Sequence, residues 1–307
     1  MKIGAVQAAP VFLDRGATVD RATALIAEAG RDGVEVLAFP EGFLPGHPGW
    51  VELLPFDGRA LELGAQIFAA AVEVPGPEIA AVASACGEAE VAAVLGICER
   101  LPGSTGTLFN TQVLIAADGS LAAKHQKFVP TIGERLVHAP GRTGTTNAMT
   151  LAEGRTVSGL ICGENSNPLA QYATALAYPT VHAAAWPQHF SPAVPMAAVI
   201  ELVSRGLAYT LKSFVLNAVT LISPEMIATY GLDEDSRSFL ESDLAGGRAS
   251  IVGPTGAVLA KATDPTEQIV TAEVDPAEII RLKQVHDFAG HYNRPELFAP
   301  LFKSDNP

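Results

Sequence analysis

Short apolar runs alternate with longer amphipathic stretches along the whole of this 307-residue chain. Runs such as 3–7 and 214–222 have the length and composition of buried strands, whereas 18–32 and 195–212 carry apolar residues at helical spacing. Strands and helices that interleave in this way favour an α/β fold. Ala117-Asp118-Gly119 separates two short runs and predicts a hairpin, so we expect antiparallel as well as parallel pairing.

Three of the apolar runs lead into side chains that can do chemistry. Glu41 follows the run 34–40, Lys127 closes the run 121–127, and Cys162 follows the run 156–161. Function concentrates at such junctions, where a rigid scaffold passes into a loop. A thiol nucleophile, a general base and a cation are together the parts needed to open a carbon–nitrogen bond by covalent catalysis.

The same residues carry a family resemblance. Phe39-Pro40-Glu41, Lys127-Phe128-Val129-Pro130-Thr131 and Cys162-Gly163-Glu164-Asn165 resemble, in order, the three catalytic blocks of the nitrilase superfamily of carbon–nitrogen hydrolases. Two further blocks, 133–138 and 290–296, resemble the nitrilase branch more than the amidase branches. The resemblance extends from Val6-Gln7 to about Phe298 and so covers nearly the whole chain.

The resemblance implies a fold and an assembly. It implies a four-layer αββα sandwich in which two mixed sheets face each other, formed by one domain over residues 1–307 with 299–307 as a short C-terminal tail. A homodimer or a higher homo-oligomer is expected. The short tail argues against the extended spirals that nitrilases with long tails often build.

The resemblance also implies catalytic roles, to be weighed against simpler ones. Cys162 would be the nucleophile, Glu41 the general base, Lys127 the group that stabilises each tetrahedral stage, and Glu134 the residue that positions Lys127 and the substrate. A nearby cation should lower the pKa of a reactive thiol, and burial should raise that of a carboxylate base. The simpler alternatives are an exposed lysine at a strand end and solvated acids in surface loops. Lys124 is expected to be the solvated lysine.

The other two cysteines fit a structural role. Free cysteine is commonly a small buried hydrophobe, and Cys86 lies in an alanine-rich helical stretch while Cys98 lies in an apolar strand. Replacing either by alanine is expected to affect stability alone, by about 1 kcal/mol. Cys162 differs because a polar, flexible Gly163-Glu164-Asn165 segment follows it.

Candidate substrate-binding residues flank these blocks; they are Trp186, His189, Phe43, Ile132, Glu164 and Asn165. Phe43, with His47 and Trp50, is expected to wall the mouth of the pocket, and a place in the core is an equal alternative for Trp186. A turn-stabilising role suits Glu164 better than chemistry, and a structural role suits Asn110. Gly163 stands where many nitrilases carry tryptophan, and Ile132 where an aromatic often follows the threonine, so the pocket should differ in shape.

Composition excludes several classes of function. The net charge of −13, from 20 basic and 33 acidic residues, argues against nucleic-acid and anionic-membrane partners. Three dispersed cysteines indicate a reducing compartment, and the cytoplasm is the expected location. The chain contains no CxxC or HExxH pattern, so neither a metal nor another cofactor is expected. No apolar run approaches the ~20 residues that a transmembrane helix needs.

The expected activity is hydrolysis of a small organic nitrile, aromatic or arylaliphatic, to a carboxylic acid and ammonia. An amidase or N-carbamoyl amide hydrolase would use the same residues, and a non-catalytic scaffold of this fold is the alternative from another class. Residues 224–247 form a mostly polar stretch, which predicts a surface loop or, more specifically, a lid over the site.

Overall fold

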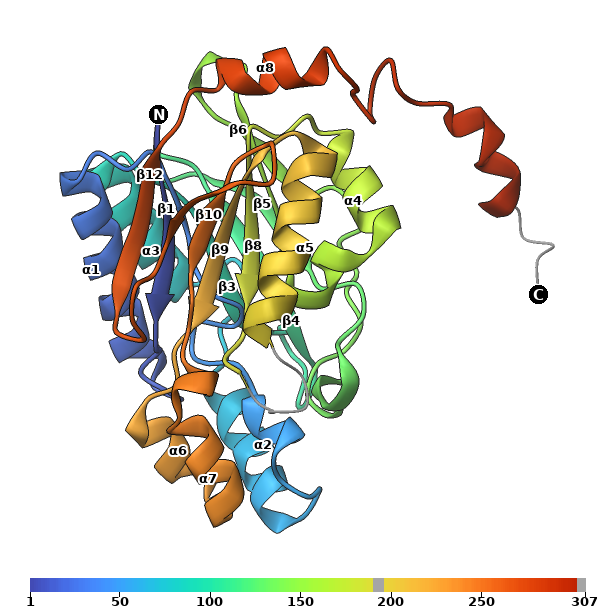
Figure 1. The fold of residues 1–307 in the computed structure, drawn as a ribbon. Coiled ribbons are helices and arrows are strands. Elements are labelled where there is room, and N and C mark those ends of the chain that lie inside the picture. Colours follow the sequence, from blue (N-terminus) through green and yellow to red (C-terminus); the bar gives the residue numbers. More distant parts are fainter. Residues whose placement is uncertain (190–195, 303–307) are drawn as a thin grey trace.

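A computed structural model describes residues 1–189 and 196–302 of the chain (Figure 1). Its twelve strands form one continuous sheet in the order β5-β4-β3-β2-β1-β9-β8-β7-β6, with β10 paired to β9, β11 to β10 and β12 to β1. The predicted two sheets are therefore two halves of one sheet, joined where Gln7 and Ala8 of β1 pair with Val219 and Thr220 of β9. Contacts of β2 with β8 and of β4 with β7 show that the halves face each other.

The strand bounds follow the apolar runs closely. The first half holds β1 (Lys2–Ala8), β2 (Val36–Ala38), β3 (Ala92–Arg100), β4 (Leu108–Ile115), β5 (Leu121–Gln126) and β12 (Gln268–Glu273). The second half holds β6 (Ala148–Thr150), β7 (Thr156–Ile161), β8 (Val181–Trp186), β9 (Phe214–Thr220), β10 (Ser250–Val252) and β11 (Val258–Lys261).

Helices cover both outer faces and complete the expected αββα layers. α1 (Arg15–Arg31) and α3 (Pro77–Ala89) pack on the first half, and α4 (Pro168–Ala175) and α5 (Met196–Leu211) lie beside the second (Figure 1). A hydrophobic cluster that includes Ile3, Val36 and Val94 of one half and Val181 and Ala183 of the other fills the space between them. Alternate residues of the first half, such as Val6 and Leu95, pack outward against α1 and α3, because side chains alternate between the faces of a strand.

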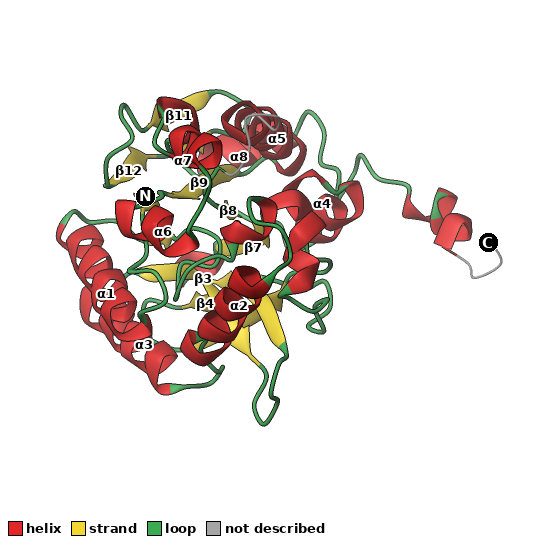
Figure 2. Ribbon diagram, turned by 90° about the horizontal axis from the view of Figure 1, so that it is seen from below, coloured by secondary structure: helices red, strands yellow, loops and turns green. Residues whose placement is uncertain are grey.

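The direction of the strands places the site. β1, β2 and β3 run parallel, as do β1, β9, β8 and β7. β5 is antiparallel to β4, which is antiparallel to β3, so β5 runs in the same direction as these strands. Their carboxyl ends therefore share one edge of the sheet, where ligand sites of α/β folds gather. α2 (Gly58–Ala70), α6 (Pro224–Tyr230) and α7 (Glu234–Leu240) lie beyond that edge, as the view from below shows (Figure 2).

The prediction of a loop over residues 224–247 is wrong, because this stretch contains α6, α7 and the short turn Asp243–Ala245. Ser223 and Asp233 cap α6 and α7 through their side chains. Met226 and Tyr230 of α6 are buried against Trp50. The few apolar residues thus sit at helical spacing inside an acidic sequence. A lid role for this segment stays a prediction, and α2 and β6 were not anticipated.

The C-terminal segment extends away from the body of the molecule (Figure 1). It follows α8 (Ala277–Lys283) at the end of the sheet opposite to α2, and it carries the short turns Pro295–Leu297 and Ala299–Phe302. Asn293 of the predicted 290–296 block donates a hydrogen bond to the Tyr172 hydroxyl at 2.8 Å. That block therefore contacts α4. Of the predicted tail, residues 303–307 fall outside the described part. Among the described residues, no helix is long and apolar enough to cross a bilayer.

Candidate active site

The carboxyl-end edge of the sheet brings Glu41, Lys127 and Glu134 together. Glu41 lies just past β2, Lys127 directly follows β5, and Glu134 lies in the turn η2 (Ile132–Leu136). Nζ of Lys127 lies 2.8 Å from Oε1 of Glu41 and 2.6 Å from Oε2 of Glu134. All three side chains are buried. The ammonium is thus held between two carboxylates in a site from which water is largely excluded.

Asn110 ties the two carboxylates to each other. It lies on β4, and its Nδ2 donates to Oε1 of Glu41 and to Oε1 of Glu134, both at 2.7 Å. Its backbone carbonyl accepts from the amide of Lys127 at 2.8 Å. One side chain and one peptide group of a rigid strand therefore fix three catalytic candidates at once. Asn110, for which we expected a structural role, thus positions the side chains of the site itself.

The two carboxylates differ in their proton affinity. Burial raises the pKa of Glu41, and the negative charge of Glu134 adds to this, while Lys127 and Asn110 oppose it. Burial would also raise the pKa of Glu134, but hydrogen bonds from His138 and the charge of Lys127 bring it below the ordinary value. Glu134 is therefore the anion of the pair, and Glu41 is the carboxyl group that more readily takes up a proton.

Lys127 keeps its charge. Burial would lower its pKa, but Glu41, Cys162 and Glu134 together raise it above the ordinary value. His47, by contrast, lies with Nε2 3.5 Å from Oε1 of Glu41, and burial lowers its pKa to about 3, so this imidazole is neutral.

One oxygen of Glu41 is left for chemistry. Oε1 accepts the hydrogen bonds from Lys127 and Asn110. Oε2 is buried and has no hydrogen-bond partner among the described residues. A buried carboxylate oxygen of this kind is costly unless a proton or a donor reaches it. Such an oxygen is suited to take up a proton from a neighbouring thiol or water.

Cys162 opens the turn η4 (Cys162–Ser166) directly after β7. Its φ of 48° lies in the left-handed region, which is uncommon for a residue other than glycine and recurs at functional sites. The Asn165 amide holds the turn by donating to the carbonyls of Leu160 and Cys162 at 3.2 and 3.0 Å. His182 faces Asn165 Oδ1 at 3.0 Å and completes this support.

Glu164 connects the nucleophile turn to the lysine loop. Its Oε2 accepts from the amide of Ile161 at 3.0 Å and lies 2.9 Å from Nε2 of His125, and its Oε1 accepts from the amide of Phe128 at 2.6 Å. Glu164 thereby joins the residue before Cys162 to the residue after Lys127. The structure thus uses both Glu164 and Asn165, which we expected to bind substrate, to hold backbone.

Lys127 lowers the pKa of the Cys162 thiol, as expected of a nearby cation, but the pKa as a whole is raised. Burial raises the pKa, Glu41 and Glu134 raise it further, and Lys127 lowers it by less than these effects together. Burial is the largest cause, and the two carboxylates near the thiol outnumber the single ammonium. The resting thiol is therefore protonated, and it needs a base to become a nucleophile.

The remaining candidate substrate residues are scattered. Phe43 does not line the site, because it is fully buried and packs on Phe39 in the cluster beneath α1 and α3. The Trp186 ring is buried and donates to Asn217 Oδ1 at 3.0 Å, and only its carbonyl reaches Glu41, whose amide donates to it at 3.2 Å. His189 is buried just past β8.

Ile132 and Trp50 differ in their exposure to solvent. Ile132 is 62% exposed on the turn that carries Glu134. Trp50 is buried and lines an apolar cavity of about 320 Å³ between α2 and the turns 49–52 and 132–136, away from Cys162. Lys124 is also not simply solvated, since it pairs with the buried Glu99 at 2.7 Å.

Glu41, His47 and Glu134 offer ligand atoms within 4.8 Å of one another, a spacing that could suit a metal ion. Lys127 already bonds to both carboxylates, however. The ammonium therefore supplies the positive charge at this position, and no metal is needed to balance the two acids.

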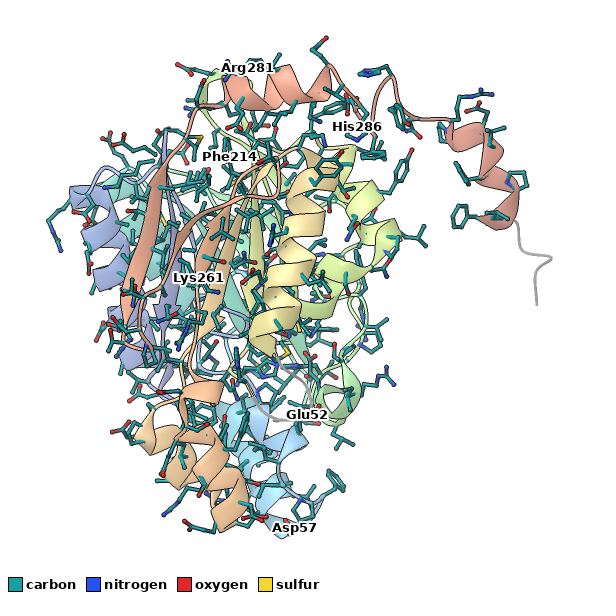
Figure 3. All side chains as sticks on the ribbon, in the orientation of Figure 1. Glu52, Asp57, Phe214, Lys261, Arg281 and His286 are labelled. Carbon is teal, nitrogen blue, oxygen red and sulfur yellow. The ribbon has the colours of Figure 1, made fainter. Side chains whose placement is uncertain are left out.

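Reasoning from the sequence missed His138, which lies with Nδ1 2.9 Å from Oε1 of Glu134. The signal that could have found it is its spacing. His138 follows Glu134 by four residues, and side chains so spaced meet on one face of a helical turn. Glu52 was also missed; its Oε1 accepts from the amide of Gly133 at 2.8 Å. Glu52 lies at the lower end of the molecule, whereas Arg281 and His286 lie at the opposite end (Figure 3).

Comparison with known proteins shows the family of this chain. The sequence profile of the family described as carbon–nitrogen hydrolase matches residues 2–284. The chain is 36% identical over 306 residues to Nitrilase 2 from an unknown prokaryotic organism, covering 99% of this chain and 93% of that protein. It is 33% identical to an aliphatic nitrilase from Rhodococcus rhodochrous, covering 98% and 82%, and 31% identical to an arylacetonitrilase from Aspergillus kawachii, covering 97% and 90%.

Solved structures share the fold at lower identity. A carbon–nitrogen hydrolase from Helicobacter pylori superposes with a TM-score of 0.74 at 18% identity, covering 98% of each chain. An amidase from Nesterenkonia sp. AN1 gives a TM-score of 0.69 at 17% identity, covering 98% of this chain and 97% of that one.

Proposed function

This chain belongs to the carbon–nitrogen hydrolase family, and from that premise we propose that it is a nitrilase whose nucleophile is Cys162. The observation that carries the proposal is that the two carboxylate oxygens of Glu41 have different surroundings. One oxygen of Glu41 is held by Lys127 and Asn110, the other has no hydrogen-bond partner among the described residues, and the charge of Glu41 acts on the protonated thiol of Cys162. Named nitrilases among the relatives at 31–36% identity favour a nitrile as the electrophile.

The reaction begins with proton transfer. Glu41 takes the proton of the Cys162 thiol as the sulfur adds to the nitrile carbon, and it passes that proton to the nitrogen, which gives a neutral thioimidate and returns Glu41 to its carboxylate form. Lys127, held charged by its two carboxylates, donates a hydrogen bond to the nitrogen on which negative charge develops. Groups fixed in this way before the reaction stabilise the transition state without a reorganisation cost.

Two waters complete the turnover. Glu41 takes a proton from the first water as it adds to the thioimidate carbon, and it passes that proton to the nitrogen. The hydroxyl proton of the tetrahedral intermediate is then relayed through Glu41 to the nitrogen, the carbon–nitrogen bond breaks, and ammonia departs to leave an acyl-thioester. The second water, activated in the same way, adds to the thioester and releases the carboxylic acid and the thiol. The sum is one nitrile and two waters converted to one acid and one ammonia, with Glu41 returned to its starting protonation state.

Aromatic or arylaliphatic nitriles are our preferred substrate class, because the two turns beside the site carry the exposed apolar Ile132 and the open Gly163. The relatives include both an aliphatic nitrilase and arylacetonitrilases. A small molecule is the only partner that this site requires, and a homo-oligomer stays a prediction.

An amidase is the second candidate, because the amidase from Nesterenkonia superposes over nearly the whole chain. The Glu-Lys-Cys arrangement would serve an amide through the same acyl-thioester, entered directly with loss of ammonia.

The test is ammonia release from a matched panel of aliphatic, aromatic and arylaliphatic nitriles and their amides. Wild type and Cys162→Ala are measured side by side, with circular dichroism as the control for folding. We expect turnover of nitriles that the variant loses. Turnover of amides alone would move the protein to the amidase branch, and silence on both would favour a non-catalytic scaffold.

A further inference from the structure

Cys98 is linked to the proposed active site through His138. Its Sγ lies 3.2 Å from Nε2 of His138, whose Nδ1 lies 2.9 Å from Oε1 of Glu134. Cys98 lies on β3 directly opposite Asn110 of β4, which also contacts Glu134. All of these side chains are buried. The chain of contacts therefore leads from the middle of the sheet to the carboxylate that holds Lys127.

The direction of each hydrogen bond follows from the chemistry of its partners. Glu134 also accepts from Lys127, Asn110 and the amide of Thr131, as an ionised carboxylate does. It therefore needs a proton on Nδ1 of His138. A neutral imidazole with that proton has a lone pair on Nε2, and the thiol of Cys98 can donate to it. Burial raises the pKa of Cys98, and Glu134 and Glu99 raise it further, so this thiol keeps its proton.

We propose that Cys98 and His138 are positioning residues that keep Glu134 an anion against Lys127, which leaves Glu41 as the single carboxylate that exchanges protons with Cys162. The proposal rests on the proposed function, since it assigns a task to that same site. It differs from the sequence-based expectation, in which Cys98 contributed to stability alone.

The electrostatics of the cluster support this assignment. The ionisable groups near Glu134 are Lys127, His138, His47, Glu41, Cys162 and Cys98. The hydrogen bond from His138 is the largest influence that holds the pKa of Glu134 low, ahead of the charge of Lys127. Without it, burial would favour a protonated Glu134. Lys127 would then lose half of its compensating charge, and two acids rather than one would compete for the proton.

The chain offers a matched control in Cys86. Like Cys98, Cys86 is fully buried, and burial raises its pKa to about 12. It lies in α3 within the cluster beneath the first half of the sheet, and no polar contact of its thiol is found among the described residues. Cys86→Ala therefore removes a buried thiol without touching the chain of contacts.

The experiment measures the pH dependence of kcat and kcat/KM for wild type, His138→Phe, His138→Gln, Cys98→Ala, Cys98→Ser and Cys86→Ala, with whichever nitrile or amide the wild type hydrolyses. In His138→Phe, kcat should fall by about tenfold to a hundredfold, as expected for the loss of one hydrogen bond to a charged group. The acid limb should move to higher pH, because activity then requires Glu134 to lose a proton as well.

The conservative variants separate positioning from packing. His138→Gln and Cys98→Ser retain a donor and should recover most of the wild-type profile, whereas Cys98→Ala should shift the acid limb in the same direction as His138→Phe by a smaller amount. Cys86→Ala should lower the melting temperature without moving the limb. If His138→Phe is too unstable to purify, Cys98→Ala against Cys86→Ala decides the question. Identical pH profiles for Cys98→Ala and Cys86→Ala would overturn the proposal.

A second readout does not depend on hydrolysis. The rate of Cys162 alkylation by iodoacetamide reports the thiolate, which Glu134 opposes and Lys127 favours. His138→Phe should label Cys162 faster than wild type below neutral pH, where its Glu134 becomes protonated, and His138→Gln should not. An unchanged labelling profile would refute the role of His138 even if hydrolysis were robust. Wild type that hydrolyses nothing would refute the nitrilase assignment, while the labelling would still decide this inference.

Discussion

Two turns on opposite halves of the sheet share one backbone design. The turn 132–136 begins Ile-Gly-Glu, and the turn 162–166 begins Cys-Gly-Glu. The first residue of each has a left-handed φ, 46° at Ile132 and 48° at Cys162. The glutamate of each folds back onto the amide three residues earlier, at 2.9 Å for Glu134 and 3.0 Å for Glu164. We call them the Ile132 turn and the Cys162 turn.

The turns differ in what faces them. Glu134 of the Ile132 turn contacts an ammonium and an imidazole, Lys127 and His138. Glu164 of the Cys162 turn contacts the Phe128 amide and His125. The same local geometry therefore holds a carboxylate against charged partners in the Ile132 turn, and it joins two backbone segments in the Cys162 turn. Partners from distant elements decide the chemistry, and the turn itself decides only where the first side chain and the carboxylate are placed.

The largest expected effect concerns the first position of each turn. Cys162→Ala should reduce kcat by about 10⁴-fold or more, because the covalent route is lost. Ile132→Ala should change KM by no more than about tenfold, since this exposed side chain adds only apolar contact to a substrate. Steady-state kinetics on one nitrile compares them directly. Comparable losses of activity in both variants would mean that the two turns do not have the different roles described.

The second effect concerns the glutamates. Glu134→Gln should lower kcat by about 10²–10³-fold, because Lys127 loses one of the charges that hold it in place. Glu164→Gln should lower kcat by about tenfold and reduce stability by about 1–3 kcal/mol, because an amide can replace only some of three buried hydrogen bonds. Kinetics paired with urea unfolding would check this order. The comparison fails if Glu164→Gln is the more damaging change to kcat at equal stability.

The third prediction concerns pH and assigns the acid limb to Glu41. Burial raises the pKa of Glu41 above 4.5, and the base must be deprotonated, so kcat/KM should fall about tenfold per pH unit once the pH drops below that raised value. The pKa of Glu134 is lowered in the folded protein. Its contribution to stability is therefore present above pH 4.5 and is lost only as the pH falls toward that folded pKa.

Activity should therefore vanish before acid unfolding begins. The limb should keep its position in Glu164→Gln, because that carboxylate is not part of the proton exchange. Coincident loss of activity and of the folded circular-dichroism signal would contradict the assignment to Glu41.

The smallest effect concerns the glycines. A Cβ at Gly133 would lie 2.8 Å from the carbonyl oxygen of Val51, whereas at Gly163 the nearest atom would be Thr131 Oγ1 at 3.7 Å. Gly133→Ala should thus cost about 1–3 kcal/mol of unfolding free energy, and Gly163→Ala should stay within about 0.5 kcal/mol. Thermal and urea unfolding measure both. Equal stability of the two variants would show that the Ile132 turn is not constrained by the neighbouring segment.

The sequence predicted most of what depends on local pattern. Glu41, Lys127 and Cys162 could be proposed because each follows an apolar run, and parallel strands bring such junctions to one edge. The layers of the fold followed from the resemblance. The prediction of a loop over residues 224–247 failed because their acidic composition obscured two short helices. The few buried apolar residues of these helices belong to the same hydrophobic cluster as Trp50.

What the sequence could not supply is contact between distant elements. Asn110 and Lys127 are adjacent only because β4 and β5 pair, and Cys98 reaches His138 across 40 residues. The direction of the pKa shift at Cys162 depends on its burial and on the charges that surround it, which no spacing reveals. The expected and the observed roles of residues therefore differ at the site, where several elements converge.

The pairing of β1 has a consequence for biosynthesis. β1 is made first, yet most of one of its edges is covered by β12, and the amine of Met1 bonds to the carbonyl of Val274 across 273 residues. On the ribosome, β2 can pair with β1 early, while the opposite edge stays open until β12 emerges. An open edge strand invites pairing with other chains. Nascent chains of this protein should therefore depend on protection by chaperones until β12 has been translated.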